Sequence, residues 1–246
     1  MLMVTGMLSF RRGVQIEFAT LIAVLLFAGL SLTFTMVANE MSEGETHAFD
    51  NAIMSAMRDP ADPSRPAGPA WLTESARDIT SLGGQPLLLM VSIATVGFLV
   101  LSRARGAALL VLVSVAGGSG LVTAMKQLFA RVRPDAVAQS VYELTRSFPS
   151  GHTTLSAVTY LTIGALLARV QPNRVLKAYI LTIAILVTGL VGLSRVYLGV
   201  HWPTDVLAGW CLGAAWAMAC WFVALRLQRL GQVERSIGPE PHNVSM

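Results

Sequence analysis

The chain has 246 residues, of which 13% are charged and 54% belong to the apolar set AVILMFWYC. Soluble proteins average about 25% charged residues, so a chain this apolar cannot cover a water-facing surface and is predicted to be a membrane protein. Its 18 Lys and Arg against 14 Asp and Glu give a net charge of +4. Because the basic residues are scattered among apolar blocks, this charge does not indicate nucleic-acid binding, and no nucleic-acid partner is expected.

Six segments without a charged residue approach or reach the roughly 20 apolar residues with which a helix crosses a bilayer. We therefore expect an all-α fold, a polytopic membrane helical bundle with six transmembrane helices. The first segment follows two arginines, as the apolar part of a signal peptide would. Its length exceeds the roughly 7–15 residues of such a part, so we expect a retained helix. The predicted spans are Phe18–Asn39, Gly84–Ser102, Gly106–Met125, Thr153–Ala168, Ala178–Ser194 and Val206–Leu225.

A long loop, Glu40–Gly83, separates the first two spans. Apolar residues spaced four apart at Phe49, Ile53 and Met57 predict a short amphipathic helix on the membrane surface. A second such helix is predicted around Trp71 to Ile79, after the Pro-rich connector 59–69. The chain thus divides into residues 1–83 (N-terminal tail, first transmembrane helix and this loop), residues 84–228 (a core with five transmembrane helices) and residues 229–246 (a polar tail, expected to be disordered).

The loops on the side of the N-terminus are short, carry more Lys and Arg than the loops on the other side, and are almost free of acids. The positive-inside rule then predicts that both termini are cytoplasmic and that the long loop is extracytoplasmic. We expect a multi-pass protein of the inner (plasma) membrane.

Three polar clusters lie at the ends of the last four spans, and the predicted topology places all of them on the extracytoplasmic face. They are Lys126-x6-Arg133-Pro134, Pro149-Ser150-Gly151-His152 and Ser194-Arg195-x5-His201-x3-Asp205.

The positively charged residues of these clusters are suited to binding an anion. Lys126, Arg133 and Arg195 would repel one another unless an anion lay between them, and guanidinium groups match the paired oxygens of phosphate. Ser150 and Gly151 stand at a predicted helix start, where a hydroxyl and backbone N–H groups point at an anion and the helix dipole favours it. The clusters therefore predict a phosphate site.

Two histidines accompany the predicted phosphate site. His201 and Asp205 are four residues apart and share one face of a helical turn, so the carboxylate can fix the imidazole tautomer and leave one ring nitrogen to attack. His152 lies on another helix and suits a general acid for the departing oxygen. No group of residues has the spacing of a metal site, so neither metal nor cofactor is expected.

These motifs resemble the signature of the phosphatidic acid phosphatase type 2/haloperoxidase superfamily, K-x6-RP, PSGH and SR-x5-H-x3-D, and every fixed position is met. The resemblance implies a metal-independent, two-step phosphoryl transfer. His201 would attack phosphorus to form a phosphohistidine, Asp205 would orient it, and His152 would protonate the leaving group. The phosphoryl oxygens would be held by Lys126, Arg133, Ser150, Gly151 and Arg195.

The function expected from this resemblance is that of an integral membrane phosphatase acting on lipid phosphomonoesters or lipid pyrophosphates. Undecaprenyl pyrophosphate, phosphatidylglycerol phosphate and phosphatidate all remain open as substrates. A lipid phosphotransferase of the same superfamily is the main alternative. A vanadate-dependent haloperoxidase and a non-catalytic binding protein or transporter fit less well. The expected partners are the lipid phosphate substrate and the bilayer, and the sequence predicts no oligomeric state.

Several residues outside the motif positions are predicted to have structural roles and no part in the chemistry. Arg131 and Arg146 are predicted to anchor the chain to lipid headgroups, because neither fills a motif position. Gly117, Gly118 and Gly120 of the third span are predicted to permit close helix packing.

Overall fold

The computed structural model describes residues 2–134 and 146–229, and within them the chain forms helices joined by loops, with a lone bridge between Arg58 and Pro66 and no strand. This confirms the all-α prediction. Residues 230–246 of the expected polar tail lie outside the described residues. In chain order the helices are α1 (Leu2–Glu43), α2 (His47–Ala56), α3 (Ala70–Ser81), α4 (Gln85–Leu101), α5 (Arg105–Phe129), α6 (Gly151–Val170), α7 (Arg174–Tyr197) and α8 (Pro203–Arg229).

Each predicted span lies largely or wholly within one helix. In the described part of the chain, five helices are long and apolar enough to cross a membrane: the segment Thr20–Glu43 of α1, and α5, α6, α7 and α8. A sixth span is reached if α3 and α4, which are bent by 43° relative to each other, count as one. The chain is therefore a multi-pass membrane protein. Several helices continue past the predicted spans into polar residues, because a change in polarity indicates the membrane boundary and not the helix end.

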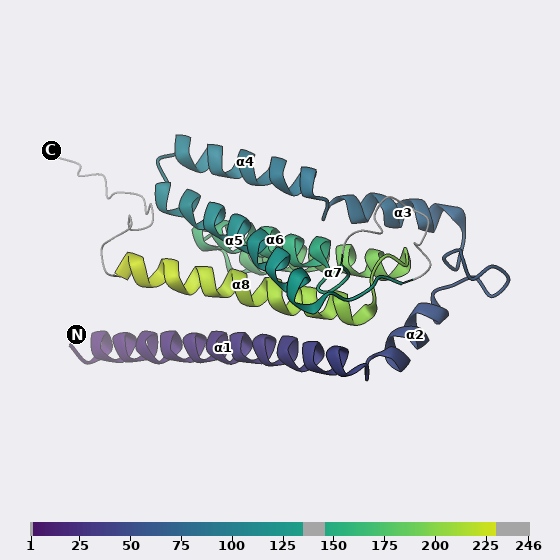
Figure 1. Ribbon diagram of the computed structural model, residues 1–246. Coiled ribbons are helices and arrows are strands. Elements are labelled where there is room, and N and C mark those ends of the chain that lie inside the picture. Colours follow the sequence, from purple (N-terminus) through teal and green to yellow (C-terminus); the bar gives the residue numbers. More distant parts are fainter. Residues whose placement is uncertain (1, 135–145, 230–246) are drawn as a thin grey trace.

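Helix α6 lies at the centre of the bundle, where it contacts α5, α7 and α8 (Figure 1). Most of its buried side chains are small or β-branched, and Ala157 and Val158 are completely buried. Helices carrying such residues approach closely without lipid between them. The long aliphatic side chains of α1, α4, α5 and α7 instead lie mainly on the outside, as expected for helices that face hydrocarbon.

The glycines of α5 only partly follow the packing prediction. A Cβ on Gly117 would lie 2.5 Å from Cζ2 of Trp216, and one on Gly118 would lie 3.4 Å from Cδ1 of the same ring. The indole of Trp216 therefore sits against these glycines, and its Nε1 donates to the Ser114 carbonyl at 2.9 Å. Gly120 differs, because a Cβ there would meet nothing within 4 Å. For that residue the prediction is wrong.

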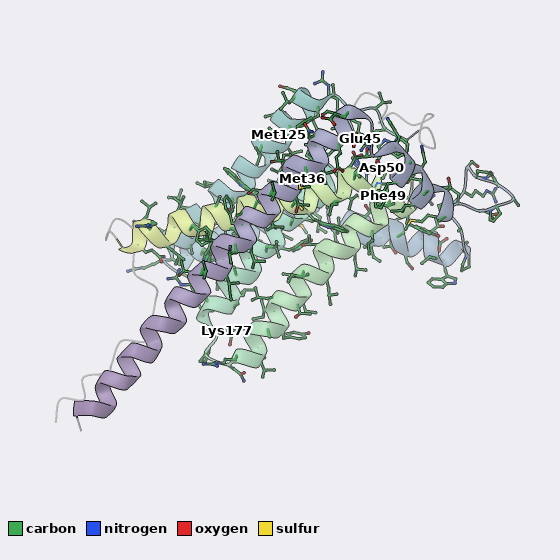
Figure 2. The ribbon with its side chains drawn as sticks, turned by 90° about the horizontal axis from the view of Figure 1, so that it is seen from below. Met36, Glu45, Phe49, Asp50, Met125 and Lys177 are labelled. Carbon is green, nitrogen blue, oxygen red and sulfur yellow. The ribbon has the colours of Figure 1, made fainter. Side chains whose placement is uncertain are left out.

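The loop between α1 and α4 forms two short helices at one end of the bundle, and in Figure 2 its Asp50 lies far from Lys177 at the start of α7. The predicted amphipathic helix is present as α2. Ile53 and Met57 pack against a buried cluster that includes Val196 and Val206, while Phe49 is 55% exposed. The apolar face of α2 is thus used to hold the end of α7 and the start of α8.

Candidate active site

The three polar clusters come together at this end of the bundle. A Cβ on Gly151 would lie 3.8 Å from Cε of Lys126, which brings the end of α5 to the start of α6. The backbone N–H of Ser150 donates to the Asp205 carbonyl at 3.0 Å, which joins α6 to the start of α8. The structure thus gathers side chains that are up to 79 residues apart, from Lys126 to Asp205, around one place.

His201, on the turn between α7 and α8, and Asp205, in the first turn of α8, form a buried pair. His201 is 1% exposed and Asp205 is fully buried. Nδ1 of the imidazole lies 3.3 Å from Oδ2 of the carboxylate, so a proton on Nδ1 is donated to it and Nε2 keeps its lone pair. Nε2 lies 3.5 Å from the NH1 group of Arg133. The carboxylate therefore fixes both the tautomer and the direction of the free nitrogen.

Burial and two nearby arginines keep the imidazole of His201 neutral, although Asp205 favours its charged form. The pKa of His201 is lowered to about 4, because burial and the charges of Arg195 and Arg133 lower it by more than the hydrogen bond and charge of Asp205 raise it. Since an ordinary histidine titrates near 6.5, His201 is unprotonated at neutral pH and carries a usable lone pair.

The three motif cations lie in this site, and the charges of Arg133 and Arg195 act on the imidazole of His201. Arg133 donates from NH1 to the Val200 carbonyl at 2.9 Å, and burial lowers its pKa while the charge of Asp205 raises it. A guanidinium titrates so high that it stays charged. Arg195, in the last turn of α7, donates from NH1 to Oγ1 of Thr80 at 3.1 Å. The Lys126 ammonium donates to the carbonyl oxygen of residue 146. All three are partly buried, so their charges act through a medium of reduced polarity.

Ser150 stands at the N-cap of α6 and is completely buried. Its hydroxyl oxygen accepts a hydrogen bond from Oγ1 of Thr153 at 2.9 Å, so its own hydrogen remains to be donated to another group. His152 is the second residue of α6. Gly83, just before α4, lies against it, because a Cβ there would be 3.1 Å from the His152 carbonyl oxygen. The start of α6 therefore presents a hydroxyl, backbone N–H groups and an imidazole together.

The position of Arg131 in the structure differs from the one predicted from the sequence. Its side chain is 7% exposed, and its guanidinium forms ion pairs of 2.6 Å with both Asp50 and Asp205. The predicted role as a headgroup anchor is wrong for this residue. The reason is local: Ala130 adopts φ +48°, a left-handed conformation that ends α5 and turns the chain before Arg131.

Arg146 remains exposed and donates to the carbonyl oxygens of Lys126 and Gln127 at the end of α5. It therefore adds a side-chain donor to carbonyls of the last turn of α5, where the Lys126 carbonyl also accepts from the Ala130 N–H. Its predicted contact with lipid headgroups stays a prediction.

Several side chains around Asp205 carry no signal in the sequence. Ser147 donates its hydroxyl to Oδ2 of Asp205. Thr204 lies in the variable gap of the third motif and contacts both Arg131 and Asp50. Asp50 comes from α2, 81 residues before Arg131. Only Arg131, two residues before a motif arginine, could have drawn attention. Among the described residues, no three His, Cys, Asp or Glu side chains gather as a metal site requires.

Comparison with known proteins identifies the family. The model of the PAP2 superfamily, the phosphatidic acid phosphatase type 2 group, matches residues 107–229, half of the chain. The chain belongs to the PAP2 superfamily. The family expected from the three motifs is thereby confirmed, and the phosphatase class with it.

Relatives within the PAP2 superfamily are named as lipid phosphatases. Phosphatidylglycerophosphatase B of Bacillus subtilis (strain 168) is 35% identical over 188 residues, which cover 75% of this chain and 87% of that protein. Undecaprenyl-diphosphatase of Sulfolobus acidocaldarius is 29% identical over 56% of this chain and 63% of that protein. Among solved structures, a transmembrane PAP2-type phosphatidylglycerolphosphate phosphatase from Bacillus subtilis matches with a TM-score of 0.71 at 31% identity, over 82% of this chain and 98% of that one.

Proposed function

We propose that this PAP2-superfamily protein hydrolyses lipid phosphomonoesters or lipid pyrophosphates through a phosphohistidine on His201. The observation that carries the proposal is the buried, neutral imidazole of His201, fixed by Asp205 through Nδ1 and directed at the cations through Nε2. A binding protein would need the cations but would have no use for an oriented neutral nucleophile beside a second histidine.

In the first step, the Nε2 lone pair of His201 forms a bond to phosphorus while the bond from phosphorus to the leaving oxygen breaks. Once the bound phosphate offsets the charges of the surrounding cations, His152 takes up a proton and gives it to that oxygen, so the lipid departs as an alcohol or as a lipid monophosphate. Asp205 stabilises the positive charge that develops on the imidazole. In the second step, a water gives a proton to His152, attacks phosphorus and breaks the P–N bond, which releases phosphate and restores both histidines.

The cations would act on the three non-bridging oxygens of the transferring group. Arg133 and Arg195 supply flat pairs of N–H donors, Lys126 supplies a point charge, and Ser150 and Gly151 supply hydroxyl and backbone donors at a helix start. Charge spreads over these oxygens in the transition state, and fixed donors of this kind are usually the largest catalytic contribution.

A lipid substrate is supported by an apolar cavity next to the polar site. A cavity of about 660 Å³ lies between α4, α5 and α6 and is lined mostly by aliphatic side chains. Leu88 and Leu155 line it and pack against Val122. Leu155 follows His152 by three residues and Val122 precedes Lys126 by four, so the cavity starts about one helical turn from the phosphate site. A hydrocarbon chain lying there would keep its phosphate among the cations.

The relatives support the chemical class of the substrate. Their names specify phosphatidylglycerophosphate and undecaprenyl diphosphate, and a further relative in Rhizobium etli is named lipid A 1-phosphatase. We propose that the site opens on the extracytoplasmic face of the inner (plasma) membrane. This is supported by the excess of Lys and Arg in the short loops at the opposite ends of the helices.

The decisive experiment compares leaving groups. Phosphate release by purified protein in detergent, without a lipid acceptor and with EDTA present, is measured for a lipid monophosphate and an activated aryl phosphate. His152→Ala should lower kcat/KM by about 10²–10⁴-fold on the lipid and by much less on the aryl ester, whose oxygen departs without a proton. His201→Ala should be inactive on both substrates. Asp205→Asn should fall between them, because the imidazole remains but loses its partner.

Each alternative to the proposed mechanism predicts a different result in this assay. Rescue of His201→Ala, and not of His152→Ala, by the aryl ester would reverse the two histidine roles. Consumption of the lipid phosphate only when a lipid acceptor is added, with the phosphoryl group recovered on that acceptor and not as free phosphate, would indicate a phosphotransferase. Loss of activity with EDTA that Mg²⁺ restores would exclude the metal-independent mechanism.

A further inference from the structure

The carboxylate of Asp205 is tied to a second buried carboxylate that no motif contains. Asp50, on α2, is fully buried. The guanidinium of Arg131 lies between the two acids and donates to Oδ1 of Asp205 through NH1 and to Oδ2 of Asp50 through NH2, each at 2.6 Å. It also packs over the Trp202 ring, 5.5 Å from the ring centroid. One cation is therefore shared between two anions whose side chains are closed to solvent.

Asp50 also completes the start of α8. A helix that begins with a capping box has a polar N-cap side chain that accepts from an N–H of the first turn, and an acidic third residue that accepts from the N-cap N–H. Trp202, directly before α8, cannot accept through its side chain. Asp205 provides one half of the box, since its Oδ2 accepts from the Trp202 N–H at 3.0 Å. Asp50 provides the other half, since its Oδ1 accepts from the Thr204 N–H at 3.0 Å.

Thr204 closes the network. Its hydroxyl accepts from NH1 of Arg131 at 2.8 Å and donates to Oδ2 of Asp50 at 2.7 Å. Each of the two acids is thus bound to the same guanidinium and to the first turn of α8. Oδ2 of Asp205 remains for His201, Ser147 and the Trp202 N–H.

We propose that Asp50 is a positioning residue for phosphoryl transfer, acting on His201 through Arg131 and Asp205. By holding half of the guanidinium, Asp50 keeps Arg131 from neutralising Asp205 completely. Asp205 then retains negative charge for the imidazolium that forms when His201 is phosphorylated. By bonding the first turn of α8, Asp50 also fixes the direction of the Asp205 side chain. The inference rests on the roles proposed above for His201 and Asp205.

The test replaces Asp50 with Asn in the full-length protein, which keeps the shape and the oxygen that accepts from Thr204 but removes the charge. We expect kcat for phosphate release to fall about 10–100-fold, as when a group that orients a reacting residue is lost. KM and the inhibition constant of inorganic phosphate should stay within about twofold, because the cations that hold the phosphoryl group are untouched. Asp62→Asn is the matched control: Asp62 is in the same loop, pairs with Arg65 and has a side chain that is 47% exposed, so the kcat of this variant should equal that of the wild type.

A double-mutant cycle separates positioning from a general weakening of the fold. If Asp50 acts through Asp205, adding Asp50→Asn to Asp205→Asn should lower kcat on the aryl ester by less than twofold. Elution in gel filtration and Tm in detergent are recorded for every variant. Thr204→Val, which removes the hydroxyl link and keeps the backbone N–H, should lower kcat without changing KM and tests the same idea if Asp50→Asn does not fold.

The inference is wrong if Asp50→Asn has a normal kcat, if its effect multiplies with that of Asp205→Asn, or if KM and phosphate inhibition change as much as kcat. His201→Ala in the same assay keeps the two proposals apart. An active His201→Ala would overturn the proposed function. An inactive His201→Ala beside a fully active Asp50→Asn would overturn only the role of Asp50.

Discussion

The buried imidazole of His201 makes the stability of the protein depend on pH in a defined direction. In the unfolded chain His201 binds a proton near pH 6.5, whereas burial lowers its pKa in the folded protein to about 4. Between these values the unfolded state binds more protons, so acid favours unfolding. The contribution of His201 is constant above about pH 6.5, becomes unfavourable as the pH falls, and levels off below about pH 4. At about pH 5 it amounts to about 2 kcal/mol of lost stability.

The assay compares wild type with His201→Gln, which keeps a polar side chain that does not titrate. Thermal unfolding in detergent is followed at about pH 7.5 and about pH 5. Both proteins share all other titrating groups. The amount by which the Tm of the wild type falls more than that of the variant therefore measures the contribution of His201 to the pH dependence of stability. For a chain of this size about 2 kcal/mol corresponds to about 4–8 °C, and the wild type should lose that much more than the variant.

Equal decreases in Tm would refute the reasoning. They would mean that His201 titrates at its ordinary pKa in the folded protein, which requires that water or a counter-charge reach it. The imidazole would then be partly protonated near neutral pH, and the proposed neutral nucleophile would lose its main support.

Two further predictions concern single contacts. Arg133→Lys keeps the charge but loses the flat pair of donors next to His201, so kcat/KM should fall by the equivalent of about 2–4 kcal/mol; an unchanged kcat/KM would show that the residue only anchors the loop. Gly192→Ala should lower the free energy of unfolding by about 1–3 kcal/mol, because its Cβ would lie 2.5 Å from Cζ2 of Trp210. Gly189→Ala, one turn earlier where a Cβ meets nothing within 4 Å, should be neutral or stabilising, and equal losses in the two variants would contradict the packing argument.

The helices and the main polar clusters could be predicted because their signals are local. A run of about 20 apolar residues has to satisfy its backbone within itself, so it forms a helix whatever it later packs against. The six predicted spans lie in α1 and α4 to α8 for that reason. Alternation between spans and polar clusters also places Lys126, His152 and His201 at one end, because successive helices cross the membrane in opposite directions.

The prediction that α2 is an amphipathic helix was correct, but the prediction that its apolar side lies on the membrane surface was incomplete. The i, i+4 spacing of Phe49 and Ile53 indicated an amphipathic helix, but the same pattern serves to face a bilayer or another helix. Only the packed structure distinguishes the two uses. It places Ile53 against the ends of α7 and α8 and leaves Phe49 exposed.

The sequence by itself therefore determined the membrane class, the helices and the residues proposed for phosphate chemistry. The tertiary structure alone decided how Asp205 is held. Arg131 could be an interfacial arginine or a buried one, and the choice depends on whether an acid lies within hydrogen-bonding distance. That acid, Asp50, is 81 residues away in the chain, with no spacing rule to connect them. A buried charge is stable only beside an opposite charge. Here the packing of distant helices brings that partner close, and the local sequence pattern around Arg131 does not predict it.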